Sequence, residues 1–307
     1  MVRYMPWYSS KPFSGEWGWH WTMNHFNPDK REREGKQLLA SHFRPLIGAY
    51  DSNDPDVLEC QVLLMKFSGV DGVIIDWYGL HDFNDYAAIH RNSGHLLKYI
   101  ERSGLKFAVC YEDRSVEQMI KGGALKAKDA VLHGKKTLRW LQGNWFNREA
   151  YLKLGSRPLM LVFGPMHYKQ QQWQAIFAGL PQPPLLLTLP HLSQKTGADG
   201  IFGWVPVHGG KRIAPAVWRE YLSDLYARGK RGEHVVAPVF PGFHDIYKEA
   251  GVHQSYGFLD DGDGATFAET LELALRSESR LIQVATWNDY GEGTMIEPTV
   301  NFGYRYL

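Results

Sequence analysis

The feature that most constrains the fold of this 307-residue sequence is the alternation of short apolar runs with longer helical patterns. The runs are rich in Val, Ile and Leu and rarely alternate with polar residues, as is typical of strands buried on both faces. Nine runs are strand candidates: 2–8, 45–51, 71–77, 106–112, 158–164, 184–189, 200–206, 235–240 and 281–287. Strands that alternate with helices over such a length predict an α/β fold, most economically a single (β/α)8 TIM-type barrel.

The helices fit between many of these strands. Asp54 is placed to cap a helix that starts at Pro55, and residues 85–103 and 213–229 have helical periodicity. Two pairs have capping-box spacing: Ser115 with Gln118, and Thr266 with Glu269.

Nine strand candidates compete for eight places in a barrel. We expect 45–51, 184–189 or 200–206 to be peripheral, or one barrel helix to be irregular or missing, since no helix fits between 189 and 200. No linker interrupts residues 1–307, which we take as a single domain. A doubly wound open sheet is the alternative, but its usual Gly-rich dinucleotide motif is absent.

Composition excludes several classes of partner. The net charge of +1 gives no field that attracts nucleic acid or an anionic membrane, and no stretch approaches the ~20 apolar residues of a membrane span. The chain runs from Met1 directly into a strand-like segment, so we expect either a cytoplasmic protein or an exported one with its signal trimmed. Cys60 and Cys110 are expected to be two buried thiols, not a disulfide.

The strongest chemical signal follows the last strand candidate. Asp289 and Glu292 stand three residues apart in a Gly-rich turn. Carboxylates this close repel each other when both ionise, which suits a general acid paired with a general base. We expect both to line one cleft, with Glu292 the more buried and its pKa raised.

Polar and aromatic residues recur at the other strand ends, where a barrel places its site. Aromatic rings stack on sugars, and carboxyl, amide and imidazole groups bind their hydroxyls, so a carbohydrate is the expected partner. The candidate substrate-binding residues are Tyr4, Trp7, Tyr8, His20, Trp21, Asp76, Trp77, Tyr78, Tyr111, Glu112, Trp204, His244, Asn288 and Tyr290.

Motifs for other chemistries are missing. There is no G-x-S-x-G elbow, no Walker A motif and no H-E-x-x-H. The run 260–264 lacks the ligand spacing of a calcium loop, and His20 and His25 have no third ligand at metal-site spacing. We therefore expect no metal and no other cofactor.

Three segments of the chain resemble glycoside hydrolases of families 99 and 71. Family 99 comprises endo-acting α-mannosidases and α-mannanases, and family 71 comprises α-1,3-glucanases. Segment 4–21, with Tyr-Met-Pro-Trp-Tyr and an aromatic loop ending in His-Trp, is similar to the first strand and loop of family 99, and segment 69–79 resembles its third strand. In segment 287–298, Gly-Thr-Met-Ile-Glu-Pro is close to family 99 and Trp-Asn-Asp-Tyr-Gly-Glu to family 71.

The resemblance implies an endo-acting glycosidase for α-linked polysaccharides or oligosaccharides, with α-mannan favoured and α-glucan next. It implies Glu292 as the general acid and Asp289 as the base. Family 99 has Glu where this chain has Asp289, and that acid is thought to deprotonate the sugar's own 2-hydroxyl, with retention. The shorter Asp289 leaves more room for a water, which favours inversion, as in family 71.

Two other interpretations remain open at this point. One is a carbohydrate-binding relative that has lost activity, although retention of both acids argues against it. The other is a family 99-like enzyme of polysaccharide biosynthesis.

Overall fold

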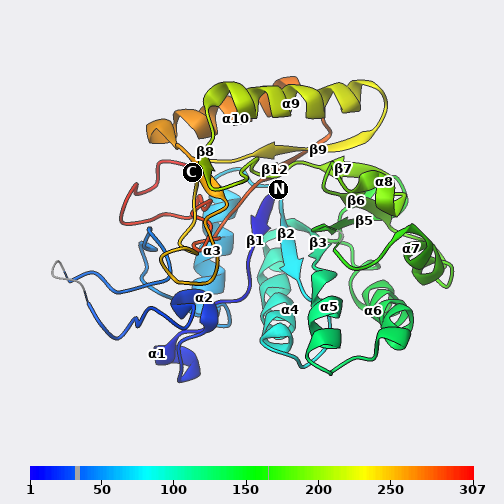
Figure 1. The fold of residues 1–307 in the computed structure, drawn as a ribbon, viewed down its shortest axis with the longest axis horizontal. Helices are drawn as coiled ribbons and strands as arrows, with labels where there is room; N and C mark the ends of the chain where they lie inside the picture. Colours follow the sequence, from blue (N-terminus) through cyan, green and yellow to red (C-terminus); the bar gives the residue numbers. More distant parts are fainter. Residues whose placement is uncertain (32–34, 165) are drawn as a thin grey trace.

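Eight parallel strands close into a barrel in the computed structural model, which describes residues 1–31, 35–164 and 166–307 (Figure 1). Each strand pairs with the next in chain order, and the last pairs with the first through Val284 and Val2. The predicted (β/α)8 barrel is therefore confirmed. Its strands are β1 (Val2–Tyr4), β2 (Gly72–Trp77), β3 (Lys106–Tyr111), β5 (Arg157–Val162), β6 (Leu185–Thr188), β7 (Gly200–Phe202), β9 (His234–Val239) and β12 (Leu281–Val284).

The ninth strand candidate, 45–51, lies outside the barrel. Within it only Pro45 makes a bridge, to Thr299. Pro45 and Gly48, which has a φ of 82°, interrupt the extended backbone that a barrel strand needs. The other two doubtful candidates both supply barrel strands. They are joined through a helix of only four residues, so this barrel helix is shortened and not lost.

Helices surround the barrel, and α9 and α10 lie side by side over one part of it (Figure 1). The helices between successive barrel strands are α3 (Pro55–Phe67), α4 (Tyr86–Ser103), α6 (Ala130–Asn144), α7 (Gln170–Phe177), α8 (Ser193–Thr196), α9 (Pro215–Lys230) and α10 (Ala265–Arg276). Asp54 caps α3 by accepting a hydrogen bond from the backbone N–H of Asp56, as predicted. The two predicted capping boxes are wrong, because Ser115 and Thr266 lie inside helices that begin before them.

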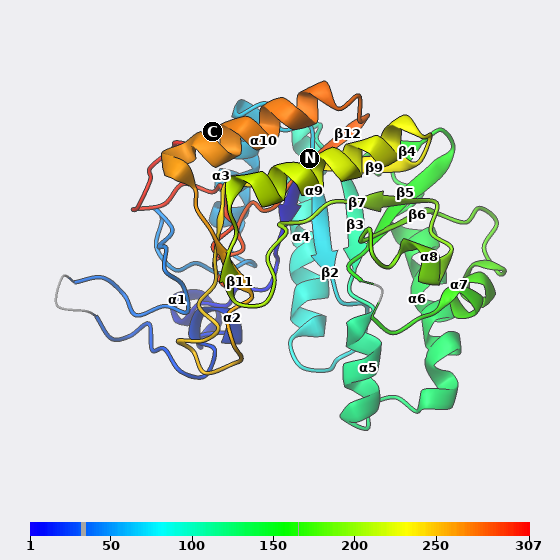
Figure 2. The ribbon, with the colours of Figure 1, turned by 45° about the horizontal axis from the view of Figure 1, so that its top comes forward.

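The remaining elements belong to the connections. In Figure 2, α1 and α2 lie toward the end to which the β2 arrow points, which is the C-terminal end of the strands. These elements are α1 (Lys11–Ser14), α2 (Trp19–Thr22), α5 (Arg114–Lys121), η1 (Ala127–Asp129), β4 (Lys153–Leu154), β8 (Lys211–Arg212), β10 (Phe243–His244), β11 (Gly257–Leu259) and η2 (Gly262–Gly264). Strands β10, β11 and β8 form a small separate sheet.

Side chains of each strand alternate between the barrel interior and the helices. On β2, Ile74 packs in a cluster with Ala108 and Leu161 of neighbouring strands, whereas Val73 packs with residues of the surrounding helices. The residue after Ile74 on the same face is Asp76, so this carboxyl points into the barrel.

Two further expectations concern the whole chain. Cys60 and Cys110 are both free thiols, although Cys60 is only partly buried. None of the helices in the described part of the chain combines the length and the apolar character that a membrane crossing requires.

Candidate active site

The turn that carries the two acids is fixed by hydrogen bonds within it. The backbone N–H of Asp289 donates to Thr286 Oγ1 at 2.8 Å, and the N–H of Glu292 donates to Asp289 Oδ1 at 3.0 Å. Gly293 has a φ of 67°, and a Cβ there would lie 2.6 Å from the carbonyl oxygen of His244. Only glycine fits this position, so the sequence of the turn dictates where the acids point.

Asn288 ties this turn to the segment that follows β1. Its side chain accepts a hydrogen bond from the N–H of Met5 at 2.8 Å and donates to the carbonyl of Met5 at 3.0 Å. It also donates to the Tyr50 hydroxyl, while the Tyr8 hydroxyl donates to the carbonyl of Asn288. Both N–H groups of the Asn288 amide are therefore engaged, and the side chain is fully buried, so its role is structural.

A buried carboxyl supports the same turn from behind. Glu297, 2% exposed, accepts hydrogen bonds from Gln61 Nε2 at 2.5 Å and from the hydroxyls of Tyr50 and Tyr290 at 2.9 Å each. Gln61 in turn accepts a hydrogen bond from the Tyr4 hydroxyl at 2.6 Å. Burial raises the pKa of Glu297 to about 7, while its hydrogen bonds oppose the rise.

Asp289 and Glu292 border one cleft at the C-terminal ends of the strands. Its deep part has a volume of about 370 Å³ and its outer part about 300 Å³. The two parts meet along a shared border that includes Asp289. That border is completed by Trp7, Tyr78, Arg114, Tyr247 and Tyr256.

The pKa values of Asp289 and Glu292 are both raised, by different combinations of causes. Burial raises the pKa of Asp289 to about 7, opposed by the backbone N–H of Glu292. Burial, together with the charges of Asp289 and Asp245, raises the pKa of Glu292 well above its usual value. The expectation that Glu292 is the more buried is wrong: Asp289 is 4% exposed and Glu292 is partly exposed, because Asp289 folds back onto the turn.

Half of the predicted substrate-binding residues border the cleft. Trp7 stacks on His20 with ring centroids 4.1 Å apart, and His20 Nε2 lies 3.2 Å from Asp85 Oδ2. Both Trp7 and His20 line the outer part, whereas Trp204 lines the deep part. The members of the predicted set that border the cleft are Trp7, Tyr8, His20, Asp76, Tyr78, Glu112 and Trp204.

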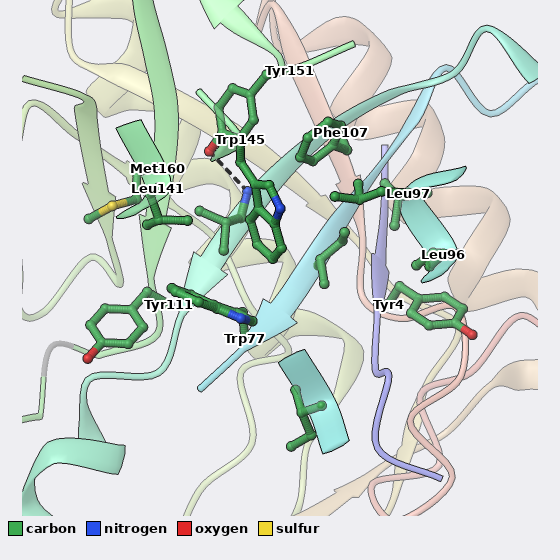
Figure 3. Packing of buried hydrophobic residues seen from close by; sticks show 14 of the residues in the cluster. Tyr4, Trp77, Leu96, Leu97, Phe107, Tyr111, Leu141, Trp145, Tyr151 and Met160 are labelled. Atoms are coloured by element: carbon green, nitrogen blue, oxygen red, sulfur yellow. Dashed lines mark hydrogen bonds between the residues drawn. The ribbon is translucent and has the colours of Figure 1, made fainter. Parts of the chain in front are cut away.

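The other half lies elsewhere, so the prediction that these side chains line the cleft does not hold. Figure 3 shows Trp77 and Tyr111 among core residues that include Leu141 and Trp145. Because neighbours on a strand face opposite ways, Asp76 in the cleft requires Trp77 to face the helices, where its indole donates to His90 Nδ1 at 3.2 Å. The residues outside the cleft are Tyr4, Trp21, Trp77, Tyr111, His244, Asn288 and Tyr290.

The reasons differ among these residues. Trp21 is buried and stacks on Tyr8, with ring centroids 4.1 Å apart. Tyr290 is buried, and its hydroxyl donates a hydrogen bond to Glu297. His244 is half-buried and stacks on His42, with ring centroids 3.7 Å apart. Its backbone N–H donates to the backbone carbonyl of Glu292. These residues support the walls of the cleft from outside it.

Sequence reasoning missed several residues that border the cleft, among them Arg3, Arg114, Tyr247 and Tyr256. Arg3 was overlooked although an arginine within an apolar strand is a usable signal of a buried charge. Arg114 follows the predicted Glu112 by two residues. Tyr247 and Tyr256 come from the connection after β9, and their spacing in the sequence carries no signal.

The fold and the site together define a class of protein. Two carboxyls that share a cleft at the C-terminal ends of barrel strands, with aromatic rings around them, are the arrangement of (β/α)8 glycoside hydrolases.

Comparisons with known proteins lead to the same class. The chain is 22% identical over 328 residues to the glycoprotein endo-α-1,2-mannosidase of Rattus norvegicus, covering 97% of this chain and 67% of the relative. The solved structure of the family 99 endo-α-mannosidase of Bacteroides thetaiotaomicron has the same fold, with a TM-score of 0.75, 18% identity, and 97% and 87% of the two chains covered. The predicted resemblance to family 99 is therefore confirmed.

A second relative accounts for the family 71 part of the resemblance. A mutanase of Penicillium rubens is 29% identical over 138 residues, which are 41% of this chain and 28% of the relative. No family model matches the chain.

Proposed function

We propose that this chain is an endo-acting glycoside hydrolase that cleaves α-linked mannose-containing glycans. Glu292 is the general acid that protonates the departing glycosidic oxygen, and Asp289 is the general base. The similarity to endo-α-mannosidases over 97% of the chain supports the substrate class. The partial similarity to a mutanase makes α-glucan the second substrate to test.

The observation that carries this proposal is the state of the acid pair. Glu292 Oε2 has no hydrogen-bond partner in the described part of the chain, and its carboxyl borders the cleft. A carboxyl with a raised pKa keeps its proton near neutral pH and can give it to a leaving group. Asp289, whose pKa burial raises to about 7, is ionised above neutral pH and can then accept a proton.

The shape of the cleft supports endo action. The deep part continues beyond the acids past Phe163 and His191, and the outer part continues past Trp19 and His253. A cleft that extends to both sides of Asp289 can hold sugars on both sides of the cleaved bond.

Turnover assays on α-mannan, on α-1,3-glucan and on an α-mannoside with a good leaving group test the assignment. Glu292→Gln should lose nearly all activity on the unactivated glycans and retain more on the activated substrate, which needs little protonation. Asp289→Asn should lose activity on all of them, because the base is needed whatever the leaving group. Glu249→Gln, which changes an exposed carboxyl in the connection after β9, is the matched control.

Two results would contradict the proposal. Full activity of the Glu292→Gln variant would exclude Glu292 as the acid. Binding of the glycans by the wild-type protein without any product would favour a binding protein that shares the barrel.

A further inference from the structure

One arginine lies inside the barrel and lines the deep part of the cleft. Arg3 is the middle residue of β1 and is only 1% exposed. Its Nη2 lies 2.6 Å from Asp76 Oδ1 on β2 and 3.8 Å from Glu112 Oε1, which follows β3. Its side chain therefore joins three neighbouring strands at the level where the cleft begins.

Three aromatic rings also lie close to the guanidinium. Its central carbon lies 5.1 Å from the ring of Phe163, 5.8 Å from Phe202 and 5.0 Å from Trp204. Ring faces attract a cation but provide no counter-charge. Arg3 Nε and Nη1 have no hydrogen-bond partner among residues 1–31, 35–164 and 166–307. The groups that can neutralise the charge of Arg3 are thus the carboxylates of the cleft.

Four carboxyls border the deep part of this cleft. They are Asp76, Glu112, Asp289 and Glu292. Each is costly to ionise away from water, and each opposes ionisation of its neighbours. Arg114 also borders the cleft but is exposed, so solvent screens its charge.

Other titratable groups face this cluster from the surrounding elements. His191, after β6, and Tyr256, after β9, line the same cleft. Tyr78 follows β2, Cys110 lies on β3, and Asp245 and Tyr247 follow β9. From the connection after β1, His20 acts on Asp76, and Tyr8 lies near Asp289. Among all of these groups, Arg3 is the buried guanidinium, and its positive charge does not depend on pH.

Building on the proposed function, we propose that Arg3 is a positioning residue for the acid pair. Its fixed charge keeps Asp76 ionised and in place, and it sets the charge of the cleft so that Asp289 is ionised while Glu292 keeps its proton. Arg3 acts through these carboxyls and does not touch the reacting atoms.

The electrostatics of the individual groups agree with this geometry. Burial is the largest influence on the pKa of Asp289 and raises it; the charge of Asp76 raises it further, and Arg3 lowers it. Burial also dominates for Asp76 and Glu112, and Arg3 lowers the pKa of both. Removing Arg3 should therefore raise the pH at which the base ionises, and removing Asp76 should lower it.

The test is the pH profile of kcat/KM for five proteins. They are the wild type, Arg3→Met, Arg3→Lys, Asp76→Asn and the double variant Arg3→Met/Asp76→Asn. In Arg3→Met the acidic limb should move upward by roughly half a pH unit or more, since an opposite charge has been removed. It should return toward the wild-type position in Arg3→Lys. The acidic limb should move to lower pH in Asp76→Asn. In the double variant it should lie between its positions in Arg3→Met and in Asp76→Asn.

The outcomes separate this inference from the proposed function. An inactive wild-type protein refutes the proposed function itself. An active wild type with unmoved acidic limbs in the variants overturns the role of Arg3, even if kcat falls at every pH, because a merely structural residue changes the rate without moving the limb. If Arg3→Met does not fold, Asp76→Asn and the charge-balanced double variant still decide the question. Arg276→Met, an exposed arginine on α10, is the control.

Discussion

The buried Glu297 offers a quantitative test of how the turn with the acids is supported. Glu297→Leu removes the acceptor of three buried donors, on Gln61, Tyr50 and Tyr290. Each orphaned donor costs about 1 to 3 kcal/mol, and relief of the buried charge offsets part of the sum, so we expect a loss of roughly 3 to 5 kcal/mol in the free energy of unfolding.

Glu297→Gln should cost less, about 1 to 2 kcal/mol, because one amide oxygen still accepts two hydroxyls. Its new amide donor can be satisfied if the Gln61 amide turns round, so that Gln61 donates to the Tyr4 hydroxyl. The pH dependence of stability provides a further test, because its direction can be derived from the pKa of Glu297. The pKa of Glu297 in the folded state is raised to about 7. Its contribution to the free energy of unfolding is therefore fully present below its pKa in the unfolded state, and it is lost as the pH rises through about 7. The stability gap between wild type and Glu297→Gln should therefore narrow between pH 5 and pH 8.

Urea unfolding followed by far-ultraviolet circular dichroism measures both variants at pH 5 and pH 8. Glu59→Leu, at an exposed position on α3, is the control and should change stability by less than about 0.5 kcal/mol. A Glu297→Leu protein as stable as wild type would refute the reasoning. So would a Gln variant as unstable as the Leu variant, because the ranking follows from the number of donors left without a partner.

Three further predictions concern the cleft and the core beside it. The pH profile of kcat should be bell-shaped: activity falls as the pH drops through about 7, where Asp289 is protonated, and falls again at higher pH, where Glu292 loses its proton. Trp77→Ala should lower the free energy of unfolding by about 3 to 5 kcal/mol, whereas Trp7→Ala should mainly weaken oligosaccharide binding, by about 1 to 2 kcal/mol. Proton NMR of the first-formed anomer should show inversion, the outcome that the shorter Asp289 favours; an α-product from an α-linked substrate would show retention.

The barrel could be predicted from the sequence because strands buried on both faces leave a clear apolar pattern. The same criterion failed at 45–51, where the apolar residues Leu46 and Ile47 are exposed in a loop. Apolar character records neither the break made by Pro45 nor the positive φ of Gly48. The pattern alone therefore predicts one strand too many.

The site was predictable in part for a related reason. Asp289 and Glu292 could be found because they share one turn, and Asp76 and Glu112 because they stand at strand ends. Trp77 and Tyr111 stand beside them, but alternation sends neighbouring side chains to opposite faces. Which of two neighbouring residues faces the barrel interior depends on the register of the strand, and this register cannot be read from the position of a strand end alone. Arg3 was not predicted because it lies in the middle of its strand and not at a strand end.

The pairing of β1 with β12 has a consequence for how the protein matures. The first barrel strand and its connection supply Arg3 and Trp7, while the segment after the last strand supplies Asp289 and Glu292. A nascent chain that has emerged only as far as β9 already has most of the barrel wall, yet it has neither acid. On the proposed assignment of Asp289 and Glu292, hydrolysis becomes possible only when the circle of strands is complete. The onset of activity in a refolding or translation experiment then marks the moment of barrel closure.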